Sequence, residues 1–277
     1  MLSLSVGPFA LSLTHLALLA SLGVALLAAH LRDRRAGTDT QKHVWRLWLL
    51  GLLVARVSFV AAYWPYYQGD WAQVVDIRDG GFLPLAGIAV VLAGAAWLAW
   101  QQPPLRGGLL AGVGCGLVVG LASSAAIDLY SQRTPLPATV LQRADGSRLA
   151  LSHYLGQPMV VNLWATWCPP CRREMPVLAA AQRQYPHVRF VLINQGESVG
   201  VVANFVATTG MALNQMLFDP EGAFARDVGA MALPTTLFYS AQGQLVGTHM
   251  GELSAASLAR GMKVLATPDP APQPSVP

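Results

Sequence analysis

The chain is poor in charged residues and in cysteine. Of its 277 residues, 12% are Asp, Glu, Lys or Arg, while 53% are hydrophobic. Soluble globular proteins carry about twice that share of charge, so the composition argues against a fully soluble protein. Three cysteines are too few for a small domain held together by disulfides. The net charge of +4 gives no indication of nucleic-acid binding. A membrane protein is therefore expected.

The shortage of charge is not uniform along the chain. Residues 1–134 contain nine Lys or Arg and six acidic residues in otherwise apolar sequence. Residues 135–277 contain nine basic and eight acidic residues, spread as on a soluble domain. We expect a four-helix transmembrane domain over 1–130, a soluble domain over 136–266, and a disordered Pro-rich tail over 267–277.

Four apolar stretches are long enough to cross a bilayer, which takes about 20 helical residues. They cover roughly 8–31, 44–64, 82–100 and 107–127. The first has no basic residue before it, which argues against a cleavable signal peptide. The loop 31–46 is basic, whereas the next loop contains three Asp and one Arg. Basic loops stay in the cytoplasm, so the N-terminus and the soluble domain are predicted to lie outside it.

Two residues inside the predicted spans need an explanation. Arg56 lies within the second span, where an ionisable side chain is a candidate for function. An arginine that holds a polar seam of the bundle together is the alternative, and both stay open. Cys115 lies in the run GVGCGLVVG, whose small residues allow helices to approach closely. A packing role is expected for this thiol.

The second half alternates short strands with helices. Strands are predicted at 158–166, 188–195 and 215–219, and helices at 168–184, 201–208, 221–228 and 254–265. One hairpin should turn at Asp145-Gly146, a strong two-residue turn signal, and another should join 234–240 to 245–251. This order predicts an α/β domain with a central mixed β-sheet flanked by helices.

The sequence Cys168-Pro-Pro-Cys171 follows the first buried strand directly. A sulfur at the first turn of a helix is stabilised as a thiolate, and the spacing brings the second cysteine into disulfide range. The alternative is half of a zinc site, which would need four Cys or His ligands. The chain has neither a second C-x-x-C nor a paired histidine. The motif therefore predicts a redox-active disulfide that uses no metal and no cofactor, with Cys168 attacking and Cys171 resolving.

With this motif, residues 136–266 resemble the TlpA/ResA-like thiol-disulfide oxidoreductases of the thioredoxin superfamily. The segment LPTTLFYSAQGQLVGTHMGELS is similar to that family's cis-proline strand, which implies a cis peptide bond at Pro234. Trp167, Leu233 and Pro234 would then flank the substrate chain. The segment INQGESVGVVANFV is similar to the region that presents a glutamate near the buried cysteine. Glu197 is thereby implied as the catalytic proton acceptor.

The resemblance implies a protein-disulfide reductase in the bacterial inner membrane, with its thioredoxin-like domain in the periplasm. Its expected partners are protein substrates with disulfides or thiols, a separate membrane electron donor, and the lipid bilayer, but not nucleic acid. Apocytochrome c maturation is the process that the family suggests. The C-x-x-C sequence alone does not determine whether the protein reduces or oxidises its substrates.

The membrane half resembles a second family. Residues 8–127, and above all 55–87, are similar to prolipoprotein diacylglyceryl transferases in an arginine-aromatic span, an acidic loop and a Gly-Gly turn. The family's histidine would fall near Leu85, and its later arginine-asparagine signature has no counterpart. Two alternatives to the reductase follow: a transferase-related membrane protein with an accessory redox domain, and a non-catalytic module that docks client cysteines.

Overall fold

The computed structural model describes residues 3–6, 9–69, 71–132, 134–210 and 215–266. The predicted tail, residues 267–277, lies outside the described residues. The chain forms two compact units. One comprises residues 11–77 and 81–129 and is called the helical unit below. The other comprises residues 1–10, 78–80 and 130–277 and is called the sheet unit.

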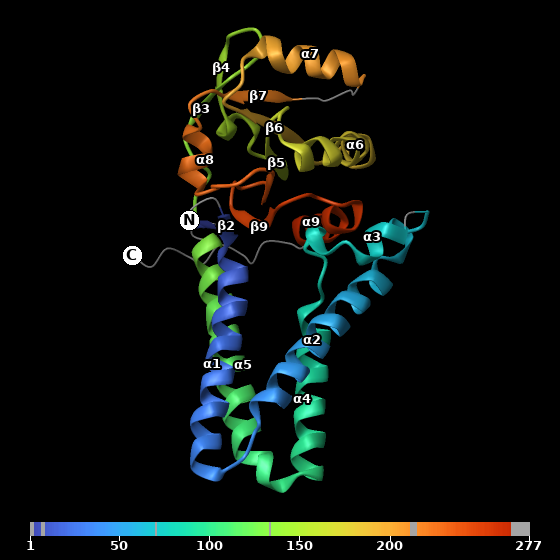
Figure 1. Cartoon of the computed structure of the whole chain (residues 1–277). Coiled ribbons are helices and arrows are strands. Elements are labelled where there is room, and N and C mark those ends of the chain that lie inside the picture. Colours follow the sequence, from blue (N-terminus) through green and yellow to red (C-terminus); the bar gives the residue numbers. More distant parts are fainter. Residues whose placement is uncertain (1–2, 7–8, 70, 133, 211–214, 267–277) are drawn as a thin grey trace. The chain divides into compact units, whose positions relative to one another are not determined.

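Four long helices make up the helical unit (Figure 1). They are α1 (Leu13–Ala36), α2 (Gln41–Ala62), α4 (Pro84–Gln101) and α5 (Arg106–Gln132). Within the described residues, four helical segments, which include these, are long and apolar enough to cross a membrane. Each of the four apolar stretches predicted from the sequence thus contains one of these helices, but residues 9–12 of the first stretch form a strand, and its helix begins only at Leu13. The loop between α2 and α4 contains α3 (Trp71–Val75) and two 3-10 turns.

Glycines let the long helices approach closely. A Cβ atom on Gly87 of α4 would lie 2.6 Å from the backbone oxygen of Gly51 in α2. A Cβ on Gly112 of α5 would lie 3.0 Å from the backbone oxygen of Ala25 in α1. The distance at Gly87 leaves no room for a side chain, so this position needs glycine, whereas the distance at Gly112 is at the limit of the Cβ contacts found in proteins. Cys115 is exposed, so the expectation that this thiol packs in the seam is wrong, because Gly112 and Gly116 occupy the buried face of α5.

Arg56 is buried near the end of α2 and binds the loop that follows. Its guanidinium donates hydrogen bonds to the backbone oxygens of four residues: Gln73, Val74, Asp76 and Gly81. It also lies over the Tyr67 ring, at 5.6 Å from the centroid. Backbone carbonyls are partners that make a buried arginine tolerable in an apolar helix. These contacts favour the structural alternative for Arg56.

The sheet unit is built on seven strands in the order β4-β3-β7-β6-β5-β8-β9. Their bounds are β3 Val140–Gln142, β4 Arg148–Ala150, β5 Met159–Trp164, β6 Arg189–Gln195, β7 Met216–Asp219, β8 Thr235–Tyr239 and β9 Leu245–Met250. The strands β5, β6 and β7 are parallel, and the other pairs are antiparallel. The mixed sheet predicted from the sequence is confirmed. A short pair that was not predicted, β1 (Ser3–Val6) and β2 (Phe9–Ser12), forms separately.

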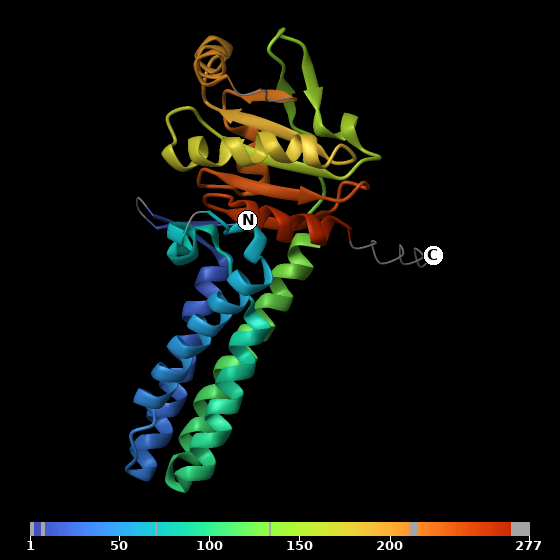
Figure 2. The same ribbon diagram turned by 90° about the vertical axis from the view of Figure 1, so that its right-hand side faces the viewer.

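Helices cover both faces of this sheet (Figures 1 and 2). One face packs against α6 (Pro169–Gln184), α7 (Val199–Thr209) and α9 (Ala255–Ala266). The other packs against α8 (Ala223–Val228) and the 3-10 turn Leu151–Tyr154. Along β5, Val160 and Trp164 point to the first layer, while Val161 and Leu163 point to the second. A strand buried on both faces explains the uninterrupted apolar run of the sequence.

Candidate active site

The disulfide lies where β5 passes into α6. Cys168 is the N-cap of α6, and its sulfur is bonded to that of Cys171 at 2.10 Å, with 5.3 Å between the Cα atoms. Pro169 and Pro170 open the helix, where their missing N–H groups cost nothing. The backbone N–H of Cys171 donates to Cys168 Sγ at 3.3 Å. This donor and the positive end of the helix dipole favour negative charge on the Cys168 sulfur.

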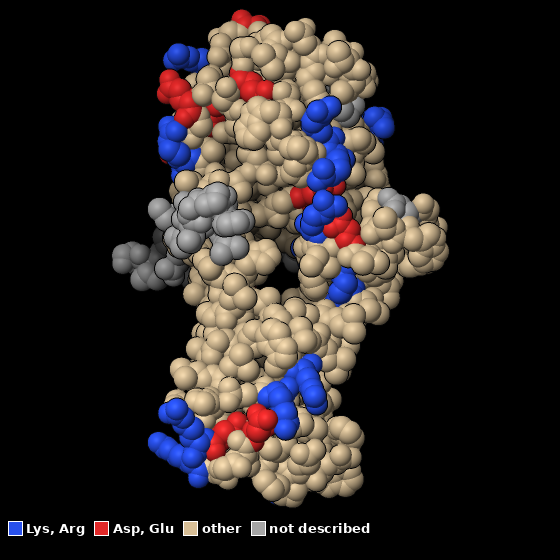
Figure 3. All heavy atoms as spheres, in the orientation of Figure 1, with Lys and Arg blue, Asp and Glu red and all other residues tan. Residues whose placement is uncertain are grey.

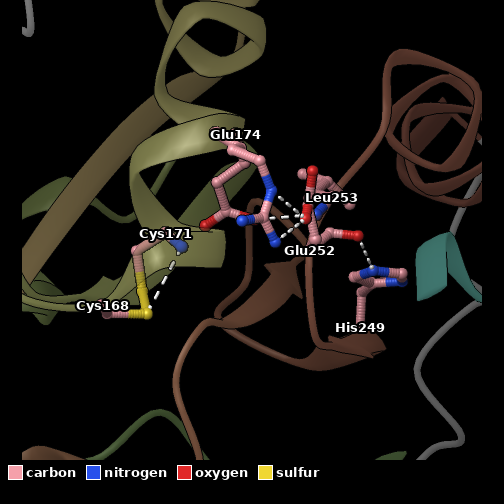
Figure 4. A network of polar contacts seen from close by, with 7 residues as sticks. Cys168, Cys171, Glu174, His249, Glu252 and Leu253 are labelled. Carbon is pink, nitrogen blue, oxygen red and sulfur yellow. Dashed lines mark hydrogen bonds and ion pairs between the residues drawn. A yellow bond between two sulfur atoms is a disulfide. The ribbon is translucent and has the colours of Figure 1, made fainter.

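A buried glutamate that the sequence analysis missed lies one turn after Cys171. Glu174 is 1% exposed, and Figure 4 shows its carboxyl beside the disulfide-bearing turn. Its Oε1 accepts a hydrogen bond from Asn162 Nδ2 at 2.7 Å, and its Oε2 accepts one from the Leu253 N–H at 2.8 Å. Burial raises the pKa of Glu174 to about 8, although both hydrogen bonds act in the opposite direction.

The sequence did carry a signal for this residue. Residues three apart on a helix lie on the same face, so Glu174 shares a face with Cys171. That face continues through Met175 and Leu178, which are buried in the core. A carboxyl on the apolar face of a helix is unusual and needs a partner. The buried position of Glu174 can therefore be predicted from the helix face that it shares with Cys171.

Glu197, the glutamate expected near the buried cysteine, lies between β6 and α7. Its Oε2 accepts hydrogen bonds at 2.7 Å from the Thr166 backbone N–H and from Asn194 Nδ2. The Thr166 hydroxyl donates to its Oε1. Thr166 is two residues before Cys168, so Glu197 holds the segment that leads from β5 to the disulfide.

The three residues expected to flank a substrate lie on two segments. Trp167 directly precedes the disulfide and is 67% exposed, which is unusual for so large an apolar ring. The Leu233–Pro234 peptide bond is cis, as the resemblance implies. Leu163 of β5 pairs with Thr235 of β8, so Pro234 lies beside the end of β5. Trp164 is fully buried against Phe205, as expected for a core residue.

Comparison with known proteins identifies the sheet unit. The model of the AhpC/TSA family matches residues 133–248. The thiol-disulfide oxidoreductase ResA of Bacillus subtilis is 32% identical over 162 residues, which cover 56% of this chain and 88% of ResA. The chain belongs to the ResA family of thiol-disulfide oxidoreductases. It is therefore an enzyme, a thiol-disulfide oxidoreductase with a thioredoxin-like domain.

Two further proteins are similar to parts of this chain. The thiol:disulfide interchange protein DsbE homolog of Paracoccus denitrificans is 37% identical over 101 residues, or 36% of this chain and 55% of that protein. A solved structure of a putative thiol:disulfide interchange protein DsbE from Chlorobium tepidum is 27% identical. That alignment covers 48% of this chain and 94% of the solved one, with a TM-score of 0.43.

Proposed function

We propose that the Cys168–Cys171 pair is the redox-active centre of a membrane-anchored enzyme that reduces disulfides of extracytoplasmic proteins. The observation that carries this proposal is the disulfide at the N-terminus of α6, one turn before the buried carboxyl of Glu174. A dithiol in this place has one sulfur activated by the helix terminus, and its second sulfur belongs to a residue on the same helix face as a buried carboxyl that can accept a proton.

The reaction is a two-step exchange. The Cys168 thiolate attacks one sulfur of the substrate disulfide, which forms a mixed disulfide and releases one substrate thiolate. Cys171 then loses its proton and attacks the Cys168 sulfur. This step forms the intramolecular disulfide and releases the second substrate thiolate. Two electrons pass from the enzyme dithiol to the substrate, and the enzyme is left oxidised.

The second step needs a proton acceptor because Cys171 is fully buried. Glu174 is suited to this role, because its pKa of about 8 is close to the ordinary value of a thiol, about 8.5. Proton transfer between groups of similar pKa is efficient. Glu197 is the alternative acceptor that the family resemblance implies. Its carboxylate oxygens already accept three hydrogen bonds, which suits a group that holds Thr166 in place.

The substrate chain would lie against the exposed Trp167 ring and the Leu233–Pro234 edge. This arrangement is supported by the exposure of Trp167 and by the pairing of β8 with β5.

We further propose a bacterial inner-membrane location, with a transmembrane domain over residues 1–130, its N-terminus outside, and the thioredoxin-like domain (136–266) in the periplasm. Basic residues gather at the end of the helical unit that carries the α1–α2 loop, among them Arg34, Arg35 and Lys42 (Figure 3). Positive charge marks the cytoplasmic end of a helical bundle. Reduction of apocytochrome c or similar thiols, with electrons from a separate membrane protein, fits this arrangement.

The test uses the full chain, purified in detergent, reduced, and mixed with a disulfide-bonded peptide. We expect stoichiometric reduction of the peptide and no reaction by Cys168→Ser. The Cys171→Ala variant should accumulate a mixed disulfide through Cys168. Reduction by Cys168→Ser would contradict the assignment of the attacking thiol. Binding of the peptide without turnover by the wild type would instead favour a docking module.

A further inference from the structure

The loop between β9 and α9 contacts the first turns of α6 at two neighbouring points (Figure 4). At the surface, Arg173 binds the Glu252 carboxylate with its Nε at 2.8 Å and its Nη2 at 2.6 Å. In the interior, the Leu253 N–H donates to Glu174 Oε2. Consecutive residues of the loop therefore hold consecutive residues of the helix, one pair through an ion pair and the other through the buried carboxyl.

A histidine of β9 also holds this loop. His249 of β9 donates through its Nε2 to the Glu252 backbone oxygen at 3.0 Å. Burial lowers the pKa of His249, so the ring is neutral at neutral pH and the Nε2 proton is free for this bond. The carbonyl and the side chain of Glu252 are thus both restrained. The N–H that immediately follows, that of Leu253, is thereby held in place.

We propose that the Arg173–Glu252 ion pair is a positioning device for Glu174 that sets the pH range over which this carboxyl is protonated. It acts in two ways. It maintains the hydrogen bond from the Leu253 N–H to Glu174 Oε2. It also neutralises the Glu252 charge, which would otherwise lie unpaired near the buried carboxyl. Neither residue is a catalytic group, since both act through Glu174.

The charges of the groups around Glu174 determine the direction in which each substitution shifts its protonation. From β5 it meets the neutral amide of Asn162, which also donates to the Thr236 hydroxyl of β8 at 3.0 Å. From the β9–α9 loop it meets the Leu253 N–H and the negative charge of Glu252, which opposes its ionisation. Arg173, next to it on α6, carries the compensating positive charge. Removing one partner of the pair therefore leaves the other charge uncompensated.

This arrangement predicts opposite effects for the two partners. Arg173→Gln leaves the Glu252 carboxylate unpaired and loosens the loop, so Glu174 should keep its proton to higher pH. Glu252→Gln retains an oxygen that can accept from Arg173 but removes the negative charge, so Glu174 should ionise at lower pH. The pair is partly exposed, at 46% and 23% of the two side chains. We therefore expect shifts of about 0.3–0.7 pH unit, which become smaller at high salt.

The experiment titrates Glu174 directly in the oxidised full chain in detergent. The sequence has four glutamates, so ¹³C labelling of their carboxyl groups gives a simple spectrum. The Glu174 signal is identified by its loss in Glu174→Gln. Arg173→Lys, which keeps the ion pair, should restore the wild-type midpoint. Arg172→Gln is the matched control, because it removes the same charge one residue away from Arg173. The Arg172 guanidinium lies over the Phe205 ring of α7, at 5.6 Å from its centroid.

The inference is overturned if Arg173→Gln and Glu252→Gln shift the Glu174 midpoint in the same direction, or no more than Arg172→Gln does. Only the effect of the ion pair on catalysis rests on the proposed function. That effect is measured separately, as the pH dependence of the rate of mixed-disulfide resolution. If the titration moves as expected but that profile does not, the positioning role stands and the proposed proton transfer to Glu174 fails.

Discussion

At the scale of single residues, the reacting pair and its surroundings differ in how far they can be predicted. The spacing of Cys168 and Cys171 is visible in the sequence and needs no knowledge of the fold. Glu174 is not visible in this way, because its importance depends on which face of α6 is buried. The family resemblance implies Glu197 as the proton acceptor, and in the structure its carboxylate accepts hydrogen bonds from Thr166 and Asn194. A motif identifies the two cysteines, whereas burial identifies the group that can take up the proton of Cys171.

Glu174 should make the stability of the sheet unit fall as the pH rises. Its folded pKa of about 8 lies above the ordinary value of 4.5, so the folded state binds a proton that the unfolded state has lost. Between these two pH values the free energy of unfolding should decrease by about 1.4 kcal/mol per pH unit. Glu174→Gln should remove this slope. Thermal unfolding of the sheet, followed by the infrared amide I band at pH 5–8, measures it.

The control for this prediction is Glu221→Gln, which changes an exposed glutamate and should keep the wild-type slope. Equal slopes in wild type and Glu174→Gln would show that the buried carboxyl does not change its proton binding on folding.

At the scale of elements, hydrophobic patterning was a reliable guide where burial is complete. The runs that became β5 and β6 are buried along almost their whole length, so an uninterrupted apolar sequence was sufficient to predict them. The prediction of the first hairpin turn was less accurate. The Arg143 N–H donates to the Ser147 oxygen, so the loop is longer than the two-residue turn expected at Asp145-Gly146. Turn length depends on the strand register, which patterning does not determine.

The close approach of α5 to α1 should be sensitive to side-chain volume at Gly112 but not at Gly114. Gly112→Leu would force the helices apart, because a Cβ there already lies 3.0 Å from a backbone oxygen. We expect a loss of about 1–3 kcal/mol. Gly114→Leu, on the same helix, has nothing within 4 Å of its Cβ and should be tolerated. Thermal aggregation of the two variants in detergent compares them. Equal loss in both would contradict the α1–α5 packing.

At the scale of the whole molecule, composition alone separated two kinds of sequence. The uneven distribution of charge predicted apolar helices before Pro135 and an α/β domain after it, and the structure contains both. The role of the helical unit could not be predicted in the same way. Arg56 illustrates the difficulty, because an arginine among apolar residues indicates function or structure equally well until its partners are known. Its carbonyl partners became visible only in three dimensions.

The proposed topology predicts where fused reporters are active. A reporter that works only outside the cytoplasm should be active after Pro277 and inactive near Gly37, which follows the basic end of α1. Both fusions can be made in the full chain and compared at equal expression. Cytoplasmic activity of the C-terminal fusion would reverse the assignment.

Electron supply should not pass through the thiol of the helical unit. A relay by thiol exchange needs two cysteines that form and break a disulfide, and residues 1–134 contain only Cys115. We expect Cys115→Ala to leave the in-cell ratio of dithiol to disulfide at Cys168–Cys171 unchanged, as measured by alkylation of free thiols. Accumulation of the oxidised form in this variant would contradict a separate membrane electron donor.

The central claim is that Glu174 takes up the proton of Cys171 when the mixed disulfide is resolved. Rapid-quench measurements of this step across pH 5–9 compare the full-length wild type with Glu174→Gln and Glu197→Gln. General bases contribute about 10²–10⁴-fold. We predict a loss near the lower end of that range for Glu174→Gln, with its pH dependence removed, and a smaller loss with the wild-type profile for Glu197→Gln. Resolution by Glu174→Gln at the wild-type rate throughout would contradict the claim.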